Sequence, residues 1–125
     1  MLLEKEPFRE KENIIKHKSY AFAIQIVNLY KILIEEKKEF VLSKQLLRAG
    51  TSIGALVRES EHAESKADFV HKLSVALKEA NEIEYWLDIL HDTEFITSQM
   101  HKTITKDNKE LLKLLTAIIK TSKKQ

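Results

Sequence analysis

The chain has 125 residues, which is the size of a single domain and is enough to bury a core without cross-links. It contains no cysteine, and this excludes a disulfide framework, a thiolate metal site and a cysteine nucleophile. Two glycines and one proline are too few for a strand-rich fold with many turns, and a net charge of +2 does not by itself indicate nucleic-acid binding.

The charge is divided unevenly along the chain. Residues 1–57 carry a net charge of +3, residues 58–94 of −6 and residues 95–125 of +5. An acidic middle and a basic end can attract each other within one subunit or between subunits. The charged N-terminal stretch does not resemble a secretory signal, and no apolar run reaches the ~18–20 residues of a membrane span. We therefore expect a cytoplasmic protein with no membrane partner.

The apolar periodicity predicts one helical domain at residues 13–121, between a charged, poorly ordered lead-in at 1–12 and a frayed tail at 122–125. The first predicted helix begins at Asn13 as N-cap and ends near Lys38. Its core positions follow helical spacing: Ile15, Phe22, Ile26, Leu29 and Leu33. A second stripe lies beside them, which predicts neighbours on two sides: Ala23, Val27, Tyr30 and Ile34. Residues 35–39 are interpreted as a solvated helix end.

A second helix is predicted at residues 41–60, with Gly50 and Gly54 four residues apart on one side. Small residues at this spacing allow a neighbouring helix to approach closely. The predicted inner face consists of Leu42, Leu46, Ala49, Ile53 and Leu56.

The third predicted helix starts at Ser65, which approximates a capping box with Asp68, and ends near His91. The fourth starts at Thr97 or Ser98 and ends near Thr121. Their inner positions are Phe69, Leu73, Ala76, Leu77, Ala80, Ile83, Leu87 and Leu90, then Ile104, Leu111, Leu115 and Ile118. Four helices with short connections predict an all-α, up-down-up-down antiparallel four-helix bundle.

The segments RAGTSIGALVRE (residues 48–59) and HKLSVALKEANEIEYWL (residues 71–87) resemble a known family. This is the family of four helix bundle proteins, also called ribosomal-RNA intervening-sequence proteins, and the resemblance covers roughly residues 13–120. Some members are encoded within insertions in bacterial 23S rRNA genes. The resemblance implies a protomer that assembles into a ring-like homopentamer, and it implies no enzymatic activity.

A more distant resemblance is to the accessory proteins of diversity-generating retroelements, which bind reverse transcriptase and RNA through a strongly basic surface. The present chain departs from that branch in its small net charge. It also departs from the common family pattern at Leu56, where an asparagine is usual. If that asparagine makes a buried polar contact, this chain has replaced the contact with packing.

A di-metal carboxylate site is one candidate for chemistry, because Glu59 and His62 have the Glu-x-x-His spacing of di-iron bundles. The pairs Asp68–His71 and Asp88–His91 imitate this spacing with aspartate. However, Glu59 lies near a helix end, and the first helix offers no carboxylate among its central core positions. We therefore expect no metal or other cofactor, and no Ser–His–Asp set or phosphate-binding loop is recognisable.

Two further groups of residues are candidates for function. A structural polar network within or between subunits is predicted from Arg48, Arg58, Glu79 and Glu82; ordinary surface charge is the alternative. A stripe of Lys102, Lys106, Lys109 and Lys113 on the fourth helix could bind RNA or DNA through phosphates, or it could serve only solubility. Tyr85 and Trp86 are interpreted as packing residues, with an aromatic binding platform as the alternative.

The sequence thus favours a non-enzymatic, homo-oligomeric structural or interaction module. An accessory factor that binds nucleic acid through the basic fourth helix is the second hypothesis. An unidentified protein partner is compatible with either.

Overall fold

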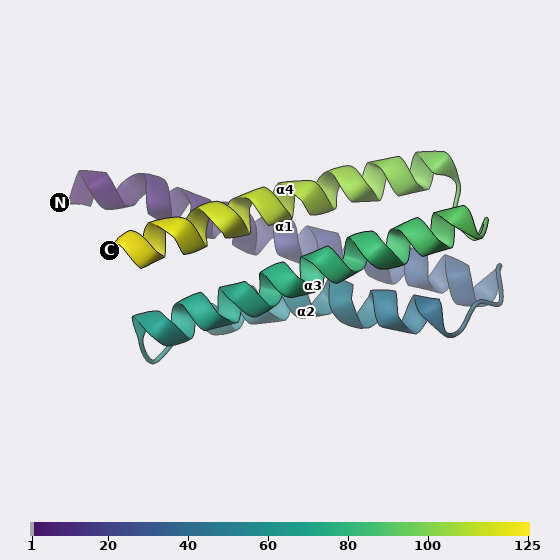
Figure 1. Cartoon of the computed structure of the whole chain (residues 1–125), viewed down its shortest axis with the longest axis horizontal. Coiled ribbons are helices and arrows are strands. Elements are labelled where there is room, and N and C mark those ends of the chain that lie inside the picture. Colours follow the sequence, from purple (N-terminus) through teal and green to yellow (C-terminus); the bar gives the residue numbers. More distant parts are fainter. Residues whose placement is uncertain (1) are drawn as a thin grey trace.

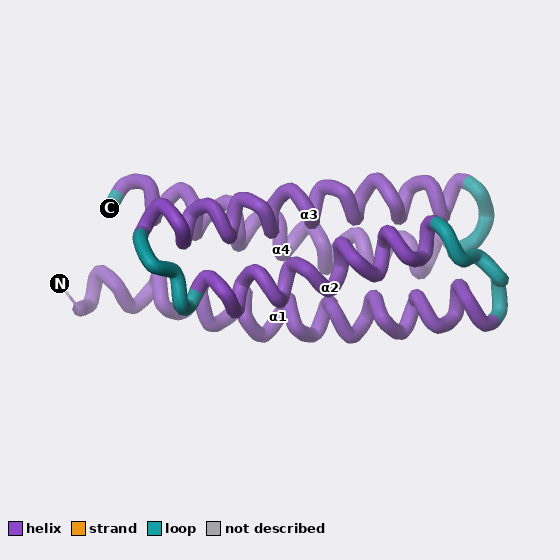
Figure 2. Tube along the Cα trace, turned by 90° about the horizontal axis from the view of Figure 1, so that it is seen from below, coloured by secondary structure: helices purple, strands orange, loops and turns teal. Residues whose placement is uncertain are grey.

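The structure, a computed structural model, describes residues 2–125, with side chains from residue 7 onward. It consists of α1 (Leu2–Glu35), α2 (Leu42–Ser60), α3 (Lys66–Asp92) and α4 (Ser98–Lys124). The four helices run alternately up and down, and both termini lie at the same end (Figure 1). Short loops join them, and residues 2–125 form no strand (Figure 2). The predicted antiparallel four-helix bundle is confirmed.

Each helix packs against the helices next to it in the chain, and α1 closes the bundle against α4. The helices α1 and α3 therefore occupy opposite corners, as do α2 and α4. Among the described residues, each of the four helices lacks the uninterrupted apolar stretch that a membrane span requires.

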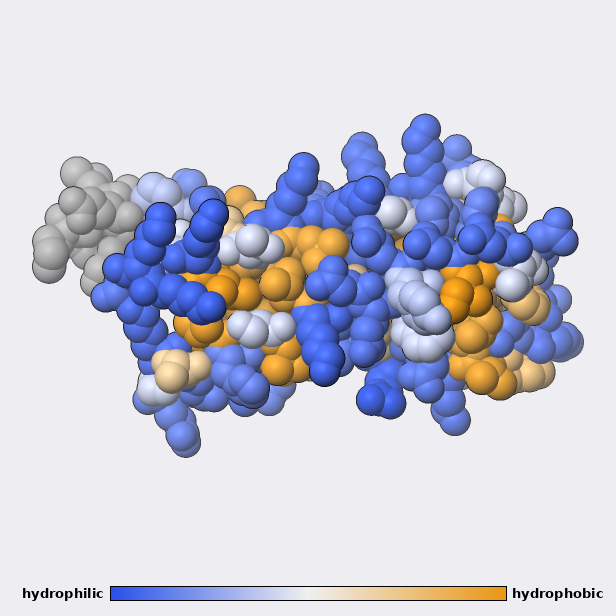
Figure 3. Space-filling model, viewed as in Figure 1, coloured by the Kyte–Doolittle hydropathy of each residue, from blue (hydrophilic) through white to orange (hydrophobic). Residues whose placement is uncertain are grey.

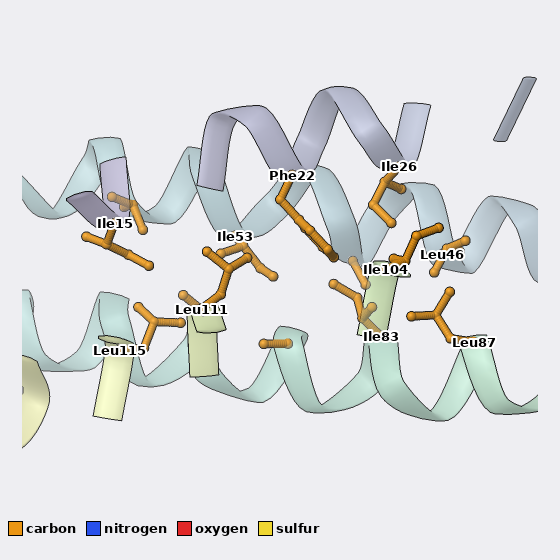
Figure 4. Close-up of a cluster of buried hydrophobic side chains, with 14 of the residues drawn as sticks. Ile15, Phe22, Ile26, Leu46, Ile53, Ile83, Leu87, Ile104, Leu111 and Leu115 are labelled. Atoms are coloured by element: carbon orange, nitrogen blue, oxygen red, sulfur yellow. The ribbon is translucent and has the colours of Figure 1, made fainter. Parts of the chain in front are cut away.

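The core runs along the axis of the bundle and contains apolar residues from all four helices (Figure 4). The predicted core positions of α1 are all buried, as are those of α4. In α2 and α3, some predicted core residues are only half-buried and pack at the margin of the core: Leu42, Leu56, Phe69 and Leu77. Val57 is buried beside Leu56, because steps of three and four drift across the inner face of a helix.

The helix ends differ from the prediction at both termini. α1 begins at Leu2 rather than near Asn13, so residues predicted as a lead-in are helical. This segment is rich in Glu, Lys and Arg, which favour helix, and the Phe8 ring lies 6.4 Å from the Phe69 ring of α3. α4 continues to Lys124, beyond its predicted end near Thr121. The N-terminal extension of α1 is thus packed on α3 through Phe8 and Phe69, and such a contact between distant segments cannot be read from the local sequence.

Capping residues define the starts of α3 and α4. The Ser65 hydroxyl accepts a hydrogen bond from the Asp68 backbone N–H at 3.0 Å, and Thr97 accepts one from Met100 at 3.1 Å. Both predicted caps are confirmed. At the end of α3, Glu94 adopts a left-handed conformation with φ of 67°. The N–H groups of Glu94 and Phe95 then bond to the carbonyls of His91 and Leu90, which is the pattern of a Schellman motif.

The two glycines of α2 lie against α1. A Cβ atom on Gly50 would lie 2.7 Å from side-chain atoms of Ile26, and one on Gly54 would lie 3.4 Å from the backbone carbonyl oxygen of Ser19. The close approach predicted from their spacing is therefore an intramolecular contact between α1 and α2.

Candidate interaction surfaces

The four predicted lysines lie on the outer face of α4. Lys102, Lys106, Lys109 and Lys113 are all exposed and recur at steps of four, three and four, opposite the buried residues of the helix. In the described part of the chain, none has a carboxylate within 4 Å. The nearby Glu110 pairs instead with Lys18 of α1 at 2.7 Å. This lysine face therefore carries uncompensated positive charge.

A shallow hollow runs along the lysine face and is also lined by His101, Thr105 and Glu110. Figure 3 shows hydrophilic residues on the upper side, where α4 lies, and apolar residues in the seam between α3 and α4. On these two helices, Leu77 of α3 and Leu112 of α4 are half-buried and pack against the core. Among the described residues, no Phe, Tyr or Trp side chain lines the hollow, so its lysines offer phosphate contacts without the large aromatic rings on which bases stack.

The predicted polar network divides between two sides of the molecule. Arg48 lies near Glu79 and Glu82 at the seam between α2 and α3. Burial and the Glu82 carboxylate raise the pKa of Glu79, while Arg48 opposes this rise. Arg58 lies elsewhere, with its guanidinium 5.1 Å from the centre of the Tyr20 ring of α1. The structure therefore groups three of the four residues and separates Arg58 from them.

Part of the outer edge shared by α1 and α2 is apolar. Tyr20 is 54% exposed, and Ile24, one turn later, is 47% exposed. Val27 follows on the same face of α1, and Leu47 and Arg58 lie on the facing edge of α2. We call this the α1–α2 surface: Tyr20, Ile24, Val27, Leu47 and Arg58.

A second aromatic surface lies at the edge shared by α2 and α3. Tyr85 is 62% exposed, and its ring meets the half-buried Trp86 ring edge-on at a centroid distance of 5.2 Å. The half-buried Ile89 follows within one turn of both. We call this the α2–α3 surface: Glu79, Glu82, Tyr85, Trp86 and Ile89.

The residues considered for a metal site have other partners. Glu59 pairs with Lys72 at 3.8 Å, and the Asp68 carboxylate accepts a hydrogen bond from the Glu64 N–H at the start of α3. Asp88 lies 2.7 Å from His101. Among the described residues, no group of three or more His, Asp or Glu side chains could hold a metal ion.

Three residues at the corner between α3 and α4 form a chain of contacts from a hydroxyl to an imidazole to a carboxylate, as in a serine-hydrolase triad. Sequence analysis did not reveal this arrangement. Ser98 Oγ lies 3.0 Å from His91 Nε2, and His91 Nδ1 lies 3.0 Å from Asp92 Oδ1. The Asp92 side chain is 77% exposed, whereas the acid of a catalytic triad is buried against the imidazole. With the His101 ring 4.8 Å from that of His91, these contacts connect the ends of two helices. We assign them a structural role.

Sequence reasoning missed the buried polar residues, of which Glu39 and Asn108 have the largest side chains. Glu39, expected in a solvated helix end, is 8% exposed and accepts hydrogen bonds from the N–H groups of Val41, Leu42 and Ser43 at 2.7–3.1 Å. Asn108 is fully buried between α4 and α3. The sequence does contain a signal for the burial of Asn108, because this residue falls on the apolar stripe of α4 between Ile104 and Leu111. The burial of Glu39 depends on the path of the loop, which the local pattern does not specify.

The fold and these surfaces define an antiparallel four-helix bundle with exposed apolar, aromatic and basic side chains along its outer edges. The model of the 23S rRNA-intervening sequence protein family matches residues 11–117, and the chain belongs to this family. The predicted family is therefore confirmed.

The chain is similar to a solved structure from Bacteroides thetaiotaomicron, described as a protein with unknown function from the S23 ribosomal protein family. The two sequences are 59% identical, the match covers 88% of this chain and 98% of that one, and the TM-score is 0.87. A comparison with functionally curated proteins found no match. These likenesses establish the family and the fold.

Proposed function

We propose that this protein is a non-catalytic, self-associating bundle that presents surfaces to partner molecules. The observation that carries the proposal is the α1–α2 surface, where Tyr20 and Ile24 remain about half exposed. Contiguous exposed apolar patches on a folded chain typically mark interaction sites, because burying them in a contact removes apolar area from water. The resemblance to the intervening-sequence proteins favours a ring-like homopentamer as the assembly.

Light scattering coupled to size-exclusion chromatography tests this proposal. The protomer mass is 14.6 kDa, so a pentamer has five times that mass, about 73 kDa. Ile24→Glu places a charge on the α1–α2 surface and should lower the mass of the assembly. Lys120→Glu, on the exposed face of α4, is the matched control and should leave the mass unchanged. A wild-type chain that stays at protomer mass at tens of micromolar would contradict the proposal.

The lysine face supports nucleic-acid binding as a second candidate function. Lys102, Lys106, Lys109 and Lys113 are exposed on one side of α4 and lack carboxylate partners among the described residues. Lysines that neutralise phosphates release counterions, and on duplex DNA each contact contributes roughly −0.9 to the slope of log affinity against log salt. Four contacts per chain would give a slope of about −3 to −4.

Fluorescence anisotropy with a labelled RNA duplex at several salt concentrations tests this function. The variant with all four lysines changed to Gln should lose binding and most of the salt dependence. A control with four other exposed lysines changed to Gln (Lys11, Lys37, Lys38 and Lys44) should retain both. Equal binding by the two variants would show that the lysine face is not the site.

A further inference from the structure

We infer that the loop between α1 and α2 attaches this protein to the surface of an anionic lipid membrane, with Phe40 and Val41 inserted among the lipids. This inference names a partner for a part of the molecule outside the α1–α2 surface, and it does not depend on self-association. Attachment to a membrane surface needs no spanning helix, so the inference departs from the sequence-based expectation of no membrane partner.

The two residues at the apex of this loop expose large apolar side chains. Phe40 has 60% of its surface exposed and Val41 has 72%, which makes Val41 the most exposed large hydrophobic residue among the described side chains. They are consecutive in the chain, and their loop lies at the end of the bundle opposite to both termini (Figure 2). Adjacent apolar side chains left in water typically mark a contact site.

Hydrogen bonds hold the loop so that these two side chains point outward. Lys38 adopts a left-handed conformation with φ of 55°, and the Glu39 N–H donates to the Leu33 carbonyl of α1 at 3.0 Å. The buried Glu39 carboxylate accepts bonds from three N–H groups at the start of α2, at 2.7–3.1 Å. Phe40 and Val41 therefore cannot turn onto the core unless these bonds break. A loop already held in this shape loses little conformational freedom when it binds.

The charges around the apex favour an anionic surface. Lys37, Lys38 and Lys44 are exposed, and none of them has a carboxylate within 4 Å in the described part of the chain. Glu39 is the remaining charged residue between positions 37 and 44, and its carboxylate is directed inward to the helix start. Lysines beside an anionic membrane are attracted to its headgroups, while apolar side chains enter the boundary of the acyl region.

Acidic residues restrict this contact to the loop. Glu35 and Glu36 are exposed where α1 ends, and Asp92 and Glu94 are exposed at the corner between α3 and α4. That corner lies at the same end of the bundle as the loop (Figure 2). Because an anionic surface repels these carboxylates, the bundle should meet the membrane tilted, with the α1–α2 loop leading and the other corner held away.

Val41 favours a lipid surface over a nucleic acid as the partner of this loop. Exposed lysines beside a phenylalanine could also contact a single strand of RNA, on which the ring would stack. A valine has no π-face for a base, yet it is even more exposed than Phe40. The acyl boundary of a membrane accepts both side chains, because it is apolar and has no fixed shape.

A fluorescent label at the apex tests insertion directly. The chain contains no cysteine, so one introduced cysteine carries the label at a chosen position. Val41→Cys labelled with nitrobenzoxadiazole should brighten when it meets vesicles of phosphatidylcholine and phosphatidylglycerol at about three to one, because the dye leaves water. The same label on Lys120→Cys, at an exposed position of α4, should not respond. No response at Val41→Cys, or equal responses at both positions, would overturn the inference.

Co-sedimentation of unlabelled variants with the same vesicles tests the apolar contribution. Phe40→Ser combined with Val41→Ser should weaken vesicle binding about tenfold. Ile14→Ser, at a residue 40% exposed in the N-terminal half of α1, is the control and should bind as the wild type does. Circular dichroism checks that both variants fold. Unchanged binding by the double variant would overturn insertion of the loop.

A pair of lysine variants tests the electrostatic contribution. Changing Lys37, Lys38 and Lys44 to Gln should weaken binding to the anionic vesicles and remove the preference over vesicles of phosphatidylcholine alone. Changing three lysines of α4 to Gln instead (Lys102, Lys106 and Lys109) should leave both unchanged. Equal losses in the two variants would show general attraction between cationic protein and anionic lipid, and would overturn attachment through the loop.

The oligomeric mass separates this inference from the proposed function. The variant with serine at positions 40 and 41 should keep the wild-type mass in light scattering. A lower mass would show that a second copy covers the loop, and it would overturn the membrane contact. A wild type that associates but does not bind vesicles would also overturn it and leave self-association standing.

Discussion

The side-chain amide of Asn108 donates a hydrogen bond of 2.8 Å to the backbone carbonyl of Ala80, joining α4 to α3 near the middle of both helices. Asn108 is fully buried, and its Oδ1 atom has no protein partner in the described structure. A buried amide oxygen without a partner opposes stability, while the one bond of the amide nitrogen favours a single register of the two helices.

Two substitutions at Asn108 should therefore act in opposite directions. Asn108→Leu removes the unpartnered oxygen and should raise the free energy of unfolding by about 0.5–1 kcal/mol. Asn108→Asp buries a carboxylate beside the Ala80 carbonyl and should lower it by about 3 kcal/mol at pH 7. Urea unfolding at fixed protein concentration measures both. Wild-type stability for Asn108→Asp at pH 7 would mean that this position is solvated.

The Glu39 carboxylate caps the start of α2, and this contact should make stability depend on pH. Burial by itself would raise the pKa of Glu39, but the backbone N–H groups of Leu42, Ser43 and Val41, with the Ser43 hydroxyl, lower it below its ordinary value of 4.5. Because the folded pKa lies below the unfolded one, this contribution is complete above pH 4.5 and is lost as the pH falls through the folded value.

Glu39→Ala should thus cost about 1–2 kcal/mol at pH 7 and much less at pH 3. Glu39→Gln retains an acceptor oxygen and should cost less, with a flatter pH dependence. Unfolding curves at both pH values measure these losses in stability. Glu36→Ala, at an exposed position, serves as control. An equal loss for Glu39→Ala at pH 3 and pH 7 would argue against a cap by the ionised carboxylate.

Gly50 and Gly54 provide a matched pair, since the same substitution meets different surroundings. Gly50→Ala forces a methyl group to within 2.7 Å of Ile26 and should destabilise the protein by about 1–3 kcal/mol. Gly54→Ala meets Ser19 at an ordinary contact distance of 3.4 Å and should stabilise it by up to about 1 kcal/mol through helix propensity. Thermal unfolding ranks the three proteins, and a reversed order would mean that α1 and α2 lie farther apart than described.

Changing Glu94 to glycine should stabilise the folded protein. Its φ of 67° lies in the left-handed region, which costs a residue with a Cβ roughly 1–2 kcal/mol and glycine almost nothing. Glycine also gains freedom in the unfolded chain, which offsets part of this benefit, so Glu94→Gly should raise stability by about 0.5–1 kcal/mol. Glu94→Ala, which removes the charge but keeps the Cβ, should show no such gain. A similar gain for both variants would trace the effect to charge.

The main features of the fold could be predicted from local pattern. Ile26, Ile53, Ile83 and Leu115 recur at helical spacing in their segments, and each is buried, because an amphipathic stripe must face a core. Ser65 and Thr97 cap α3 and α4 as their sequence context predicts, because a cap involves residues only three positions apart.

The sequence alone determined the helix count, the core stripes, two helix starts, the lysine face and the family. These depend on residues near one another in the chain, or on motifs that need no coordinates. Only the tertiary structure decided that Arg58 faces Tyr20 rather than Glu79 and Glu82, that Glu39 is buried, and that Asn108 bonds to Ala80. Each of these depends on how a helix is rotated about its axis or where a loop runs, which is set by packing between distant segments.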